Sequence, residues 1–370
     1  MRALEMIEAQ IHDEPVGVDA EPGHLGMDGL SRILFGHSAF QYLNAACELR
    51  LFDCLAETPW IGRDEIAERL GLERRSCDIL MLGTTALGLV QSVDGRYACA
   101  QIILELRESG DWARFVDTVA FEQHIVYVPQ VDFTQSLKES RNVGLARVPG
   151  QGKTLYSRLK GNPELRSIFY RYMRSWSELA NRHLVTTVDF SGQHVLDLGG
   201  GDGVNALALC AAVPDVTVTV LDLADTIDLT KEVVRHAGFS ERIRLIAGDM
   251  FVDPLPREVD VVLLAHQLVI WTPEENEALL RRSYEALRSG GTVVIMNSMS
   301  NDALDGPLIA ALDSVYFAVL PAEGGMIYPW AQHEQSLRET GFTNIRRHEC
   351  DGWTPHGIIT ATKEPNVRGR

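Results

Sequence analysis

A glycine-rich turn next to an acidic residue carries the clearest chemical signal in this sequence. The segment VLDLGGGDG, residues 195–203, places Asp197 just before Gly199 and Gly201 at the end of a short apolar run. Glycines at a strand-to-helix turn let the backbone approach a ligand closely and aim a helix N-terminus at it. The spacing is G-x-G-x-G and not the dinucleotide G-x-G-x-x-G. It favours a ligand with a cationic amino-acid moiety over a pyrophosphate.

Two further acids end the next two apolar runs. Asp222 closes VTVLD, where a carboxylate can accept both hydroxyls of a ribose. Asp249 lies in GDMF, where a carboxylate beside Met250 suits an adenine. An acid at a strand end can also be a helix cap, but three in succession beside a glycine turn indicate a ligand site. We predict S-adenosylmethionine as the ligand.

These side chains can meet only if a parallel sheet brings them together. From residue 193 onward, apolar β-rich runs alternate with helical patterns. The strands are expected at 194–198, 216–221, 243–246, 259–264 and 292–296, and the helices at 205–212, 226–237, 273–288 and 330–340. This α/β repeat predicts a Rossmann-like, doubly wound, mostly parallel sheet that residues 345–349 and 357–362 close as a hairpin. Ligand clefts in such sheets lie at the carboxyl ends of the strands, where the three acids fall.

The first half of the chain has a different texture. Residues 31–110 show helical patterns, a break at Gly71 and a hairpin turn at Asp94-Gly95, which is the order of a winged helix. Its second helix becomes apolar, so we expect a packing module and not a DNA reader. Residues 111–190 are predicted to form a helical lid over an acceptor pocket, and residues 191–370 the cofactor domain. Residues 1–30, with seven acids and one base, are expected to form an acidic arm.

Length and composition limit the possible partners. The chain has 370 residues, which favours two domains over one, and a formal net charge of −17, which disfavours nucleic acid and anionic membranes as partners. No apolar run approaches the roughly 20 residues of a membrane span, and the N-terminus lacks the pattern of a signal peptide. The six cysteines are scattered without a C-x-x-C pair. We therefore expect a cytoplasmic protein with free thiols.

The motifs together resemble a known family, the small-molecule O-methyltransferases of the plant caffeic-acid type and their bacterial secondary-metabolite relatives. The shared motifs are FYRYMRSWS (169–177), VLDLGGGDG, VLDL with Asp222, GDMF, TPEEN, LRSGGTVVI and ETGF, and they span about residues 30–362. The resemblance implies a class I S-adenosylmethionine-dependent enzyme with a helical, winged-helix domain for homodimerisation. It implies that Gly199, Gly201, Asp222, Asp249 and Met250 contact the cofactor and that Met173 lines the acceptor pocket. We assign Asp197, Leu223, Ala265 and His266 to the cofactor site as well.

One family feature is missing. Typical members carry L-H-D-W after the fourth strand, and that histidine deprotonates the acceptor hydroxyl. Here, counting back from the tryptophan of VIWTP, Val269 replaces the histidine and Ile270 the aspartate. The two glutamates that hold the histidine fall on Asn297 and Ile327, and the preceding lysine on Ala265. An apolar Val/Ile pair also cannot ligate a metal, so no metal is expected.

The loss of this base changes the expected chemistry. Holding the reactants near attack geometry can supply ~7–11 kcal/mol, while general base catalysis contributes about 10²–10⁴-fold. We therefore predict C- or N-methylation of a small aromatic metabolite, either by proximity or with another base. His266 is the first candidate for that base, because it lies at a strand end facing the cleft. His124 and Tyr127, on the predicted lid, are the second.

The acceptor pocket is expected to be apolar and aromatic. Its predicted lining comprises Phe121, Tyr127, Phe169, Met173, Trp176, Val269, Tyr316, Phe317, Met326 and Tyr328. Arg171 and Arg174, beside Met173, would suit an acceptor that bears a carboxylate.

Three alternatives stay open on the sequence alone. The first is O-methylation of an acidic phenol, which needs no strong base. The second is an enzyme that binds the cofactor without transferring its methyl group, as a cyclase, hydroxylase or decarboxylase. The third is a non-catalytic winged-helix regulator, which the net charge disfavours.

Overall fold

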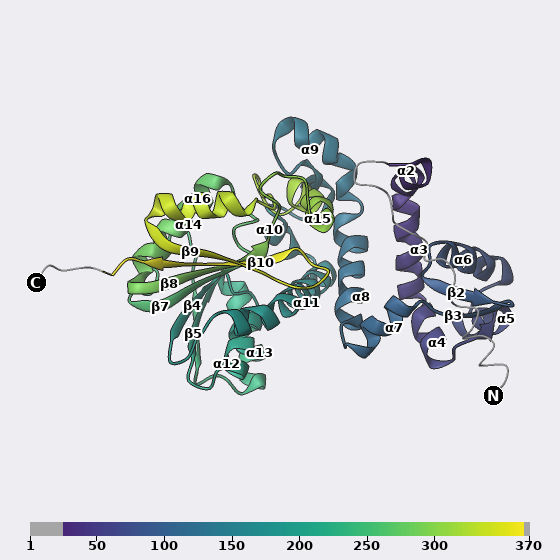
Figure 1. Ribbon diagram of the computed structural model, residues 1–370, viewed down its shortest axis with the longest axis horizontal. Coiled ribbons are helices and arrows are strands. Elements are labelled where there is room, and N and C mark those ends of the chain that lie inside the picture. Colours follow the sequence, from purple (N-terminus) through teal and green to yellow (C-terminus); the bar gives the residue numbers. More distant parts are fainter. Residues whose placement is uncertain (1–24, 366–370) are drawn as a thin grey trace, which may run out of the picture. The chain divides into compact units, whose positions relative to one another are not determined.

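The computed structural model describes residues 25–365, and the chain divides into two compact units between Ser109 and Gly110 (Figure 1). Each unit is described by itself. Most of the acidic arm expected at residues 1–30 lies outside the described residues; only residues 25–30 are seen.

The first unit is mainly helical, with one small sheet. Its helices are α2 (Met27–Leu34), α3 (Gly36–Glu48), α4 (Leu51–Glu57), α5 (Arg63–Leu70), α6 (Arg74–Ala86) and α7 (Gln101–Glu108). Helices α3 and α6 pack closely, because a Cβ on Gly83 would lie only 2.2 Å from the Tyr42 ring. Between the helices lie β1 (Ile61–Gly62), β2 (Val90–Val93) and β3 (Arg96–Cys99), in the order β1-β3-β2. The two-residue strand β1 is too short to leave a periodic pattern in the sequence.

The wing is a tight antiparallel hairpin. Strands β2 and β3 pair from Val90 opposite Cys99 to Val93 opposite Arg96. Asp94 and Gly95 connect them, both with positive φ, which a two-residue hairpin turn of this type requires. The hairpin predicted at this dipeptide is confirmed.

No described part of the chain covers the apolar side chains of helix α2. None of its residues is buried, and Met27, Leu30, Ile33 and Leu34 are all exposed. A helix with a strong apolar stripe is stable in water when that stripe packs against another surface.

The second unit begins with a run of lid helices. They are α8 (Trp112–Phe121), the π-helical turn η1 (Glu122–Val126), η2 (Pro129–Asp132), α9 (Phe133–Glu139), η3 (Val143–Arg147), α10 (Leu155–Leu159) and α11 (Pro163–Thr187). The long helix α11 begins with Pro163 at its first position, and the side chain of Asn162 accepts a hydrogen bond from the Leu165 amide. The helical structure expected for residues 111–190 is present.

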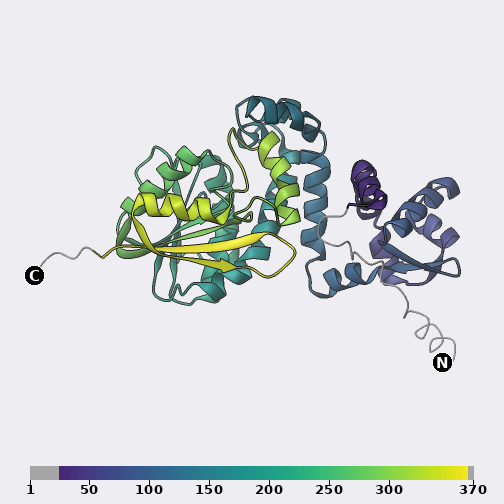
Figure 2. The same cartoon turned by 45° about the horizontal axis from the view of Figure 1, so that its top comes forward.

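The rest of the unit is built on a seven-stranded sheet. Its strands are β4 (His194–Leu198), β5 (Thr217–Asp222), β6 (Ile243–Ala247), β7 (Val259–Ala265), β8 (Leu287–Ser298), β9 (Phe342–Glu349) and β10 (His356–Lys363). The order is β6-β5-β4-β7-β8-β10-β9. Neighbours are parallel from β6 through β8, and β10 runs antiparallel to both β8 and β9 (Figure 2, yellow). The predicted mostly parallel sheet with a closing hairpin is confirmed.

Helices cover both faces of the sheet. The covering helices are α12 (Val204–Ala212), α13 (Ala224–Ala237), α14 (Pro273–Ala286) and α16 (Trp330–Thr340), together with α11, whereas α15 (Leu308–Val319) packs against α9, η2 and η3. Alternate residues of each central strand enter opposite cores: Val262 and Leu264 pack with α14 and α16, and Val261 and Leu263 pack with α11 and α12 (Figure 1). Burial on both faces explains why these strands read as continuous apolar runs.

Two elements differ from the sequence expectation. Strand β8 begins at Leu287, five residues earlier than predicted, because a register shift after Val259 lets Leu287 pair with that residue. Helix α15 was not predicted, since it is apolar on most sides and shows no amphipathic period. Both elements border the candidate site.

Candidate active site

The turn after β4 is shaped by its glycines. Gly199, Gly201 and Gly203 have φ of +69°, +58° and +82°, a region that L side chains rarely occupy. A Cβ on Gly199 would lie 2.4 Å from the side chain of Gln267, so this position also has no room for one. The turn therefore needs glycine for two reasons, conformation and close approach.

Asp222, at the end of β5, fixes this turn from the side. Its two carboxylate oxygens accept hydrogen bonds from the amides of Gly201 and Leu223, at 2.8 and 2.7 Å. Burial raises the pKa of Asp222 even though both bonds favour the charged form. Each oxygen keeps a lone pair for a further donor, such as a ribose hydroxyl.

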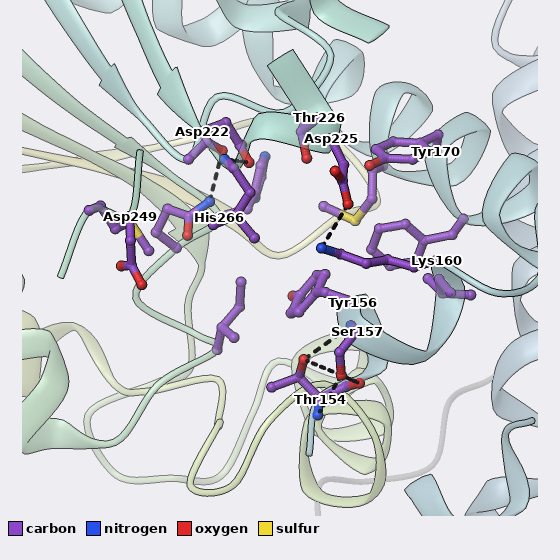
Figure 3. Close-up of a pocket in the computed structure, with 18 of the residues that line it drawn as sticks. Thr154, Tyr156, Ser157, Lys160, Tyr170, Asp222, Asp225, Thr226, Asp249 and His266 are labelled. Atoms are coloured by element: carbon purple, nitrogen blue, oxygen red, sulfur yellow. Dashed lines mark hydrogen bonds and ion pairs between the residues drawn. The ribbon is translucent and has the colours of Figure 1, made fainter. Parts of the chain in front are cut away.

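A cavity of about 340 Å³ opens at the carboxyl ends of the strands (Figure 3). The carboxyl end of β5 contributes Asp222 to its wall, and the loops directly after β4, β6 and β7 contribute Gly199, Asp249 and His266. The opposite wall comes from α10 and α11, with Tyr156, Lys160, Phe169, Tyr170 and Met173. The cavity is large enough for a nucleoside ligand.

Other predicted cofactor residues occupy three kinds of position. Leu223 and Met250 line the cavity with Asp222 and Asp249. Asp249 also accepts a hydrogen bond of 2.8 Å from the Phe251 amide, which orders the loop after β6. Gly201 and Ala265 do not line the cavity: Gly201 shapes the turn, and Ala265 is buried in the sheet core.

Asp197 lies beneath the glycine turn and outside the cavity lining. It is fully buried, and neither carboxylate oxygen has a hydrogen-bond partner among the described residues. Burial, with the charge of Asp222 nearby, raises its pKa to about 7. A Cβ on Gly200 would lie 2.5 Å from its Oδ2, so the turn closes directly over the carboxylate.

His266 lies directly after β7 in a strained conformation. Its φ is +56°, which is rare for a residue other than glycine, and its amide donates to the Met296 carbonyl at 2.7 Å. The ring lines the cavity, its Nε2 has no partner in the described part of the chain, and burial lowers its pKa to about 4. His266 is therefore a neutral imidazole that borders the cavity, with a buried Nε2 that no described residue pairs.

The position of the missing family base is filled by apolar side chains. Val269 and Ile270 are buried, and Ile270 lines the cavity beside Trp271. Ile327 is buried in the same cluster of apolar and aromatic side chains. Asn297 is fully buried in β8, and neither its amide nitrogen nor its oxygen has a partner in the described structure. No carboxylate stands at either glutamate position to orient a base.

Aromatic side chains from α8, α11 and α15 pack next to the cavity. Phe121 stacks on Tyr172 at a centroid distance of 3.7 Å and meets Tyr316 edge-on at 5.1 Å. These contacts belong to a longer series of neighbouring rings: His266, His356, Trp176, Tyr172, Phe121 and Phe169. The first and last members, His266 and Phe169, both line the cavity. Five of the predicted acceptor residues (Phe121, Phe169, Trp176, Val269 and Tyr316) and Phe317 belong to this buried cluster, and Met173 packs against it.

The remaining candidates lie further from this cluster or are otherwise occupied. The Tyr328 hydroxyl donates to the carbonyls of Trp271 and Gly324, so it is used in the fold. Met326 is exposed, and its amide binds the Val269 carbonyl. Within η1 and directly after it, His124 is exposed and Tyr127 is half-buried.

Sequence reasoning missed two acids in this region. Glu122 begins η1 directly after Phe121, and Asp313 lies on α15 one turn before Tyr316. Burial and the charge of Asp313 raise the pKa of Glu122 to about 8, and burial raises that of Asp313 to about 7. Glu122 and Asp313 belong to no sequence motif. They come into the same region only through the packing of α8, α11 and α15.

The donor set suits S-adenosylmethionine. The buried, unpartnered carboxylate of Asp197, the glycine turn without room for a side chain, and the free lone pairs of Asp222 match a cationic nucleoside. No group of three or more His, Cys, Asp or Glu side chains in the described residues is arranged to hold a metal. Fold and site together define a class I methyltransferase with a separate N-terminal domain.

Comparison with known proteins identifies the family. The O-methyltransferase domain matches residues 132–343, and the O-methyltransferase dimerisation domain matches residues 31–102. The chain is 55% identical over 342 residues to the L-tyrosine C(3)-methyltransferase of Streptomyces lavendulae, covering 92% of this chain and 93% of that protein. It is 32% identical to the 3-hydroxy-5-methyl-1-naphthoate 3-O-methyltransferase of Streptomyces sahachiroi, covering 87% and 91%. The apo structure of the S-adenosylmethionine-dependent methyltransferase SibL superposes with a TM-score of 0.82 at 45% identity, covering 92% of this chain and 100% of SibL.

The chain belongs to the O-methyltransferase family, as its motifs indicated, and it is an S-adenosylmethionine-dependent methyltransferase. It carries the family's dimerisation domain at its N-terminus. No helix in the part of the chain that the structure describes is long and apolar enough to cross a bilayer.

Proposed function

We propose that this enzyme methylates a ring carbon next to the hydroxyl of tyrosine or of a closely related aromatic amino acid, in secondary metabolism. The observation that carries the proposal is the replacement of the family's His–Asp pair by Val269 and Ile270, which are buried beside the cavity. The 55% identity to an L-tyrosine C(3)-methyltransferase supports the choice of acceptor.

An apolar wall at this position favours carbon over oxygen. In O-methylation the phenolic proton must leave as the oxygen attacks, so a base has to stand beside that oxygen. In C-methylation the attacking atom is a ring carbon, and the proton on that carbon leaves after the new bond has formed. Val269 and Ile270 offer packing and exclusion of water to the ring, and no proton acceptor to a hydroxyl. The site is therefore suited to present a carbon.

The cofactor supplies an electrophilic methyl group on a sulfonium sulfur. Asp222 would hold the ribose hydroxyls, Asp249 and Met250 would flank the adenine, and the turn at Gly199–Gly201 would face the amino-acid end. The positions of these residues in the cavity wall and along the turn support the roles. At the acceptor the chain contributes by positioning the ring. The helices of residues 111–190 supply Phe169 and Met173 as the wall opposite the strand ends.

His266 is the residue best placed to accept the ring proton. His266 borders the cavity, its Nε2 is buried without a partner among the described residues, and its ring lies 5.2 Å from that of His356, centroid to centroid. A neutral imidazole of low pKa is a weak base, but the phenol that attacks with its hydroxyl proton in place gives a cationic intermediate, a protonated dienone, whose ring proton is far more acidic than a phenol. His266 can therefore complete the reaction without being able to ionise the phenol beforehand.

Product analysis tests this function directly. The purified enzyme is incubated with S-adenosylmethionine and L-tyrosine, and the product is examined by mass spectrometry and proton NMR. We expect one added methyl group, loss of one ring proton next to the hydroxyl, and no methoxy signal. A methoxy signal would show O-methylation, and turnover that continues with S-adenosylhomocysteine in place of the cofactor would show chemistry other than methyl transfer. Either result overturns the proposal.

We infer further that the enzyme is a cytoplasmic homodimer that dimerises through its first unit. The exposed apolar side chains of α2, with the matching dimerisation domain, support a partner surface there. The six cysteines are all free thiols, which fits a reducing compartment. Size-exclusion chromatography with light scattering tests the dimer, and Ile33→Asp is expected to give monomers.

A further inference from the structure

We propose that His356 is a positioning residue for His266 and determines which ring nitrogen of His266 is free to accept a proton. The inference rests on the proposed function, in which His266 takes the ring proton of the acceptor. It adds the group that orients this base in a wall without a carboxylate for that task.

The two ring nitrogens of His266 lie in different surroundings. Nε2 is buried and has no hydrogen-bond partner among the described residues. Nδ1 also lacks such a partner, but it is not a buried atom, so it is the nitrogen that the adjoining cavity reaches. His266 lies on the side of this cavity where Asp222 and Asp249 also lie (Figure 3). A neutral imidazole carries one proton, so His266 acts as a base toward the cavity only in the tautomer with that proton on Nε2.

His356 is the neighbour that can hold His266 in this tautomer. The centroids of the two rings are 5.2 Å apart, and the ring planes meet at 63°. At this separation, nitrogens on facing edges come within hydrogen-bond distance after a small rotation of a ring. Nε2 of His356 is likewise buried and unpartnered in the described structure. Two such nitrogens satisfy each other when one donates and the other accepts, so the Nε2–H of His266 bonds to Nε2 of His356.

Strand β8 fixes the separation of the two histidines. The His266 amide donates to the Met296 carbonyl at 2.7 Å, and His356 lies opposite Ser298 at the start of β10. Both contacts are with the same strand, two residues apart. Trp176 of α11 packs against the ring of His356 at a centroid distance of 5.0 Å. The positions of the two rings therefore follow from the sheet and from α11.

Thr354 can set the tautomer of His356 in turn. Its hydroxyl oxygen lies 2.7 Å from Nδ1 of His356. When this oxygen accepts the Nδ1 proton, Nε2 of His356 keeps a lone pair for His266. The backbone beside Thr354 is tied to the end of β8, because the Pro355 carbonyl accepts a hydrogen bond of 2.8 Å from the Met299 amide. The donors then run in one direction, from His266 to His356 to Thr354, and the lone pair left over is on Nδ1 of His266.

A neutral partner orients His266 without making it a stronger base. Burial lowers the pKa of His266, and no carboxylate opposes this effect. The titratable groups that act on His356 are His266 and His183, which together with burial hold its pKa well below the usual value. A carboxylate in the place of His356 would instead raise the pKa of His266. The imidazole pair thus suits the acidic ring proton of a protonated dienone and not the proton of a phenol.

The proton reaches His266 after the methyl group has been transferred. The ring carbon bonds to the methyl carbon as the carbon–sulfur bond breaks, and the bonding pair stays on sulfur. The C–H bond at the methylated carbon then breaks, its electron pair restores the aromatic ring, and the proton binds Nδ1 of His266. His356 touches no reacting atom and acts only through the hydrogen bond from Nε2–H.

Nitrogen NMR of the histidine rings tests the tautomer without turnover. The full-length enzyme carries isotope-labelled histidine and is saturated with S-adenosylhomocysteine, and the signals of His266 are assigned by their loss in His266→Asn. We expect the proton of His266 on Nε2 in the wild type. His356→Phe keeps a ring against Trp176 but offers no acceptor, so the proton should move to Nδ1, where water in the cavity accepts it. His356→Gln offers an amide oxygen and should restore the wild-type tautomer.

Kinetics with L-tyrosine supply the functional readout. We expect kcat of His356→Phe to fall about ten-fold, a part of what loss of the base would cost, with KM for L-tyrosine unchanged. Ring-deuterated L-tyrosine should then show a primary isotope effect, because proton removal limits the rate. His356→Gln should recover most of kcat. His348→Phe is the matched control, because His348 lies on the edge strand β9, bonded to Thr360, and this variant should keep the wild-type kcat.

The outcomes separate this inference from the proposed function. A proton on Nδ1 of His266 in the wild type, or the same tautomer in the wild type and His356→Phe, overturns the positioning role. Equal losses of kcat in His356→Phe and His356→Gln without an isotope effect assign His356 to packing and also overturn it. A tautomer that responds to His356 in an enzyme whose product is a methyl ether supports the positioning role and rejects the proposed function. If His356→Phe is not folded by circular dichroism, Thr354→Val is measured in its place, with the same expected direction of the tautomer shift.

Discussion

The two halves of the active-site region treat buried charge differently. At the strand ends, the half-buried carboxylate of Asp222 accepts hydrogen bonds from two backbone amides, and that of Asp249 accepts one from a third. Under the lid, Glu122 and Asp313 are deep and hold no partner among the described residues. Apart from the buried and unpartnered Asp197, the acids of the first half are held by backbone amides, whereas neither acid of the second half is.

This difference separates a general task from a specific one. Every member of a methyltransferase family binds the same cofactor, so its half can be pre-organised by the backbone of the sheet. The acceptor half must distinguish one small molecule from many, and unpaired polar groups do so because they penalise a ligand that leaves them unpaired. The comparison predicts that substitutions in the first half weaken binding of the cofactor, while isosteric substitutions in the second half stabilise the fold and weaken selectivity.

Asp222→Ala should give the largest effect. It removes both hydrogen bonds that hold Gly201 and Leu223, together with the acceptor for the ribose hydroxyls. We expect the affinity for S-adenosylhomocysteine to fall by at least about 100-fold, the loss of two charge-assisted contacts. Calorimetric titration measures this directly. Asp225→Asn is the matched control, because Asp225 lines the same cavity but pairs with Lys160 at its exposed edge. Similar affinities of Asp222→Ala and the wild type for S-adenosylhomocysteine would show that the pre-organised turn does not contribute to cofactor binding.

His266→Asn tests the boundary between the two halves. Asparagine tolerates the left-handed conformation of this position, so the backbone should be retained. We expect kcat for C-methylation to fall by about 10²-fold, the lower range of base catalysis, with the affinity for S-adenosylhomocysteine retained. Single-turnover kinetics and titration separate the two effects. An unchanged kcat would show that His266 does not act as a base and that the chain contributes only the positioning of the reactants.

The pH dependence sharpens the same assignment. Burial lowers the pKa of His266 to about 4, and the neighbouring His356 is also neutral because burial lowers its pKa well below the usual value. His266 therefore stays unprotonated between about pH 5 and pH 8, a window in which an ordinary histidine titrates. We therefore expect the wild type and His266→Asn to show the same pH dependence of kcat across that window. A limb near the ordinary histidine pKa that disappears in this variant would contradict the burial of the ring.

Glu122→Gln should stabilise the apo enzyme in a pH-dependent way. The folded-state pKa is raised from 4.5 to about 8 by burial and by Asp313, with Tyr172 and Tyr316 as the other polar neighbours. Between these values the folded state holds a proton that the unfolded state releases, so wild-type stability falls as pH rises from about 4.5 to about 8. Glutamine has no such loss. We expect a gain of about 1–3 kcal/mol in the free energy of unfolding at pH 8 and none at pH 4, measured by urea denaturation.

Asp313→Asn should show the same sign over a lower window, because burial raises that pKa from 3.8 to about 7. Glu339→Gln controls for a change of net charge, since Glu339 is exposed and bonds only Gln335. If Glu122→Gln and Glu339→Gln have equal effects at pH 8, the acids under the lid are not electrostatically frustrated.

The same contrast explains what the sequence could predict. Asp222, Asp249 and the glycine turn follow apolar runs of strand length, and parallel strands bring their carboxyl ends to one edge of a sheet. Their neighbourhood is therefore a consequence of the βα repeat. The loss of the family base at Val269 is also legible, because it occupies a fixed distance from Trp271 in a known motif.

Glu122 and Asp313 could not be found in this way. Glu122 lies in an ordinary helical stretch, and Asp313 lies in α15, a helix without an amphipathic period. They come together through the packing of Phe121 against Tyr172 and Tyr316, and no local pattern encodes such contacts between distant helices. The left-handed turn at His266 is likewise a result of tertiary structure, since the sequence predicts only that a strand ends there.

Arg171→Met should give the smallest effect, and it tests whether the lid also recognises a carboxylate. The sequence suggested Arg171 and Arg174 for that role, but both are in ion pairs, and Arg171 is bound to Asp117 and to the Ser167 hydroxyl on the exposed side of α11. Exposed ion pairs contribute about 0–1 kcal/mol. We therefore expect less than about a threefold change in KM for L-tyrosine, within that range of free energy. A tenfold rise in KM for L-tyrosine that is absent for tyramine would instead place the acceptor's carboxylate at Arg171.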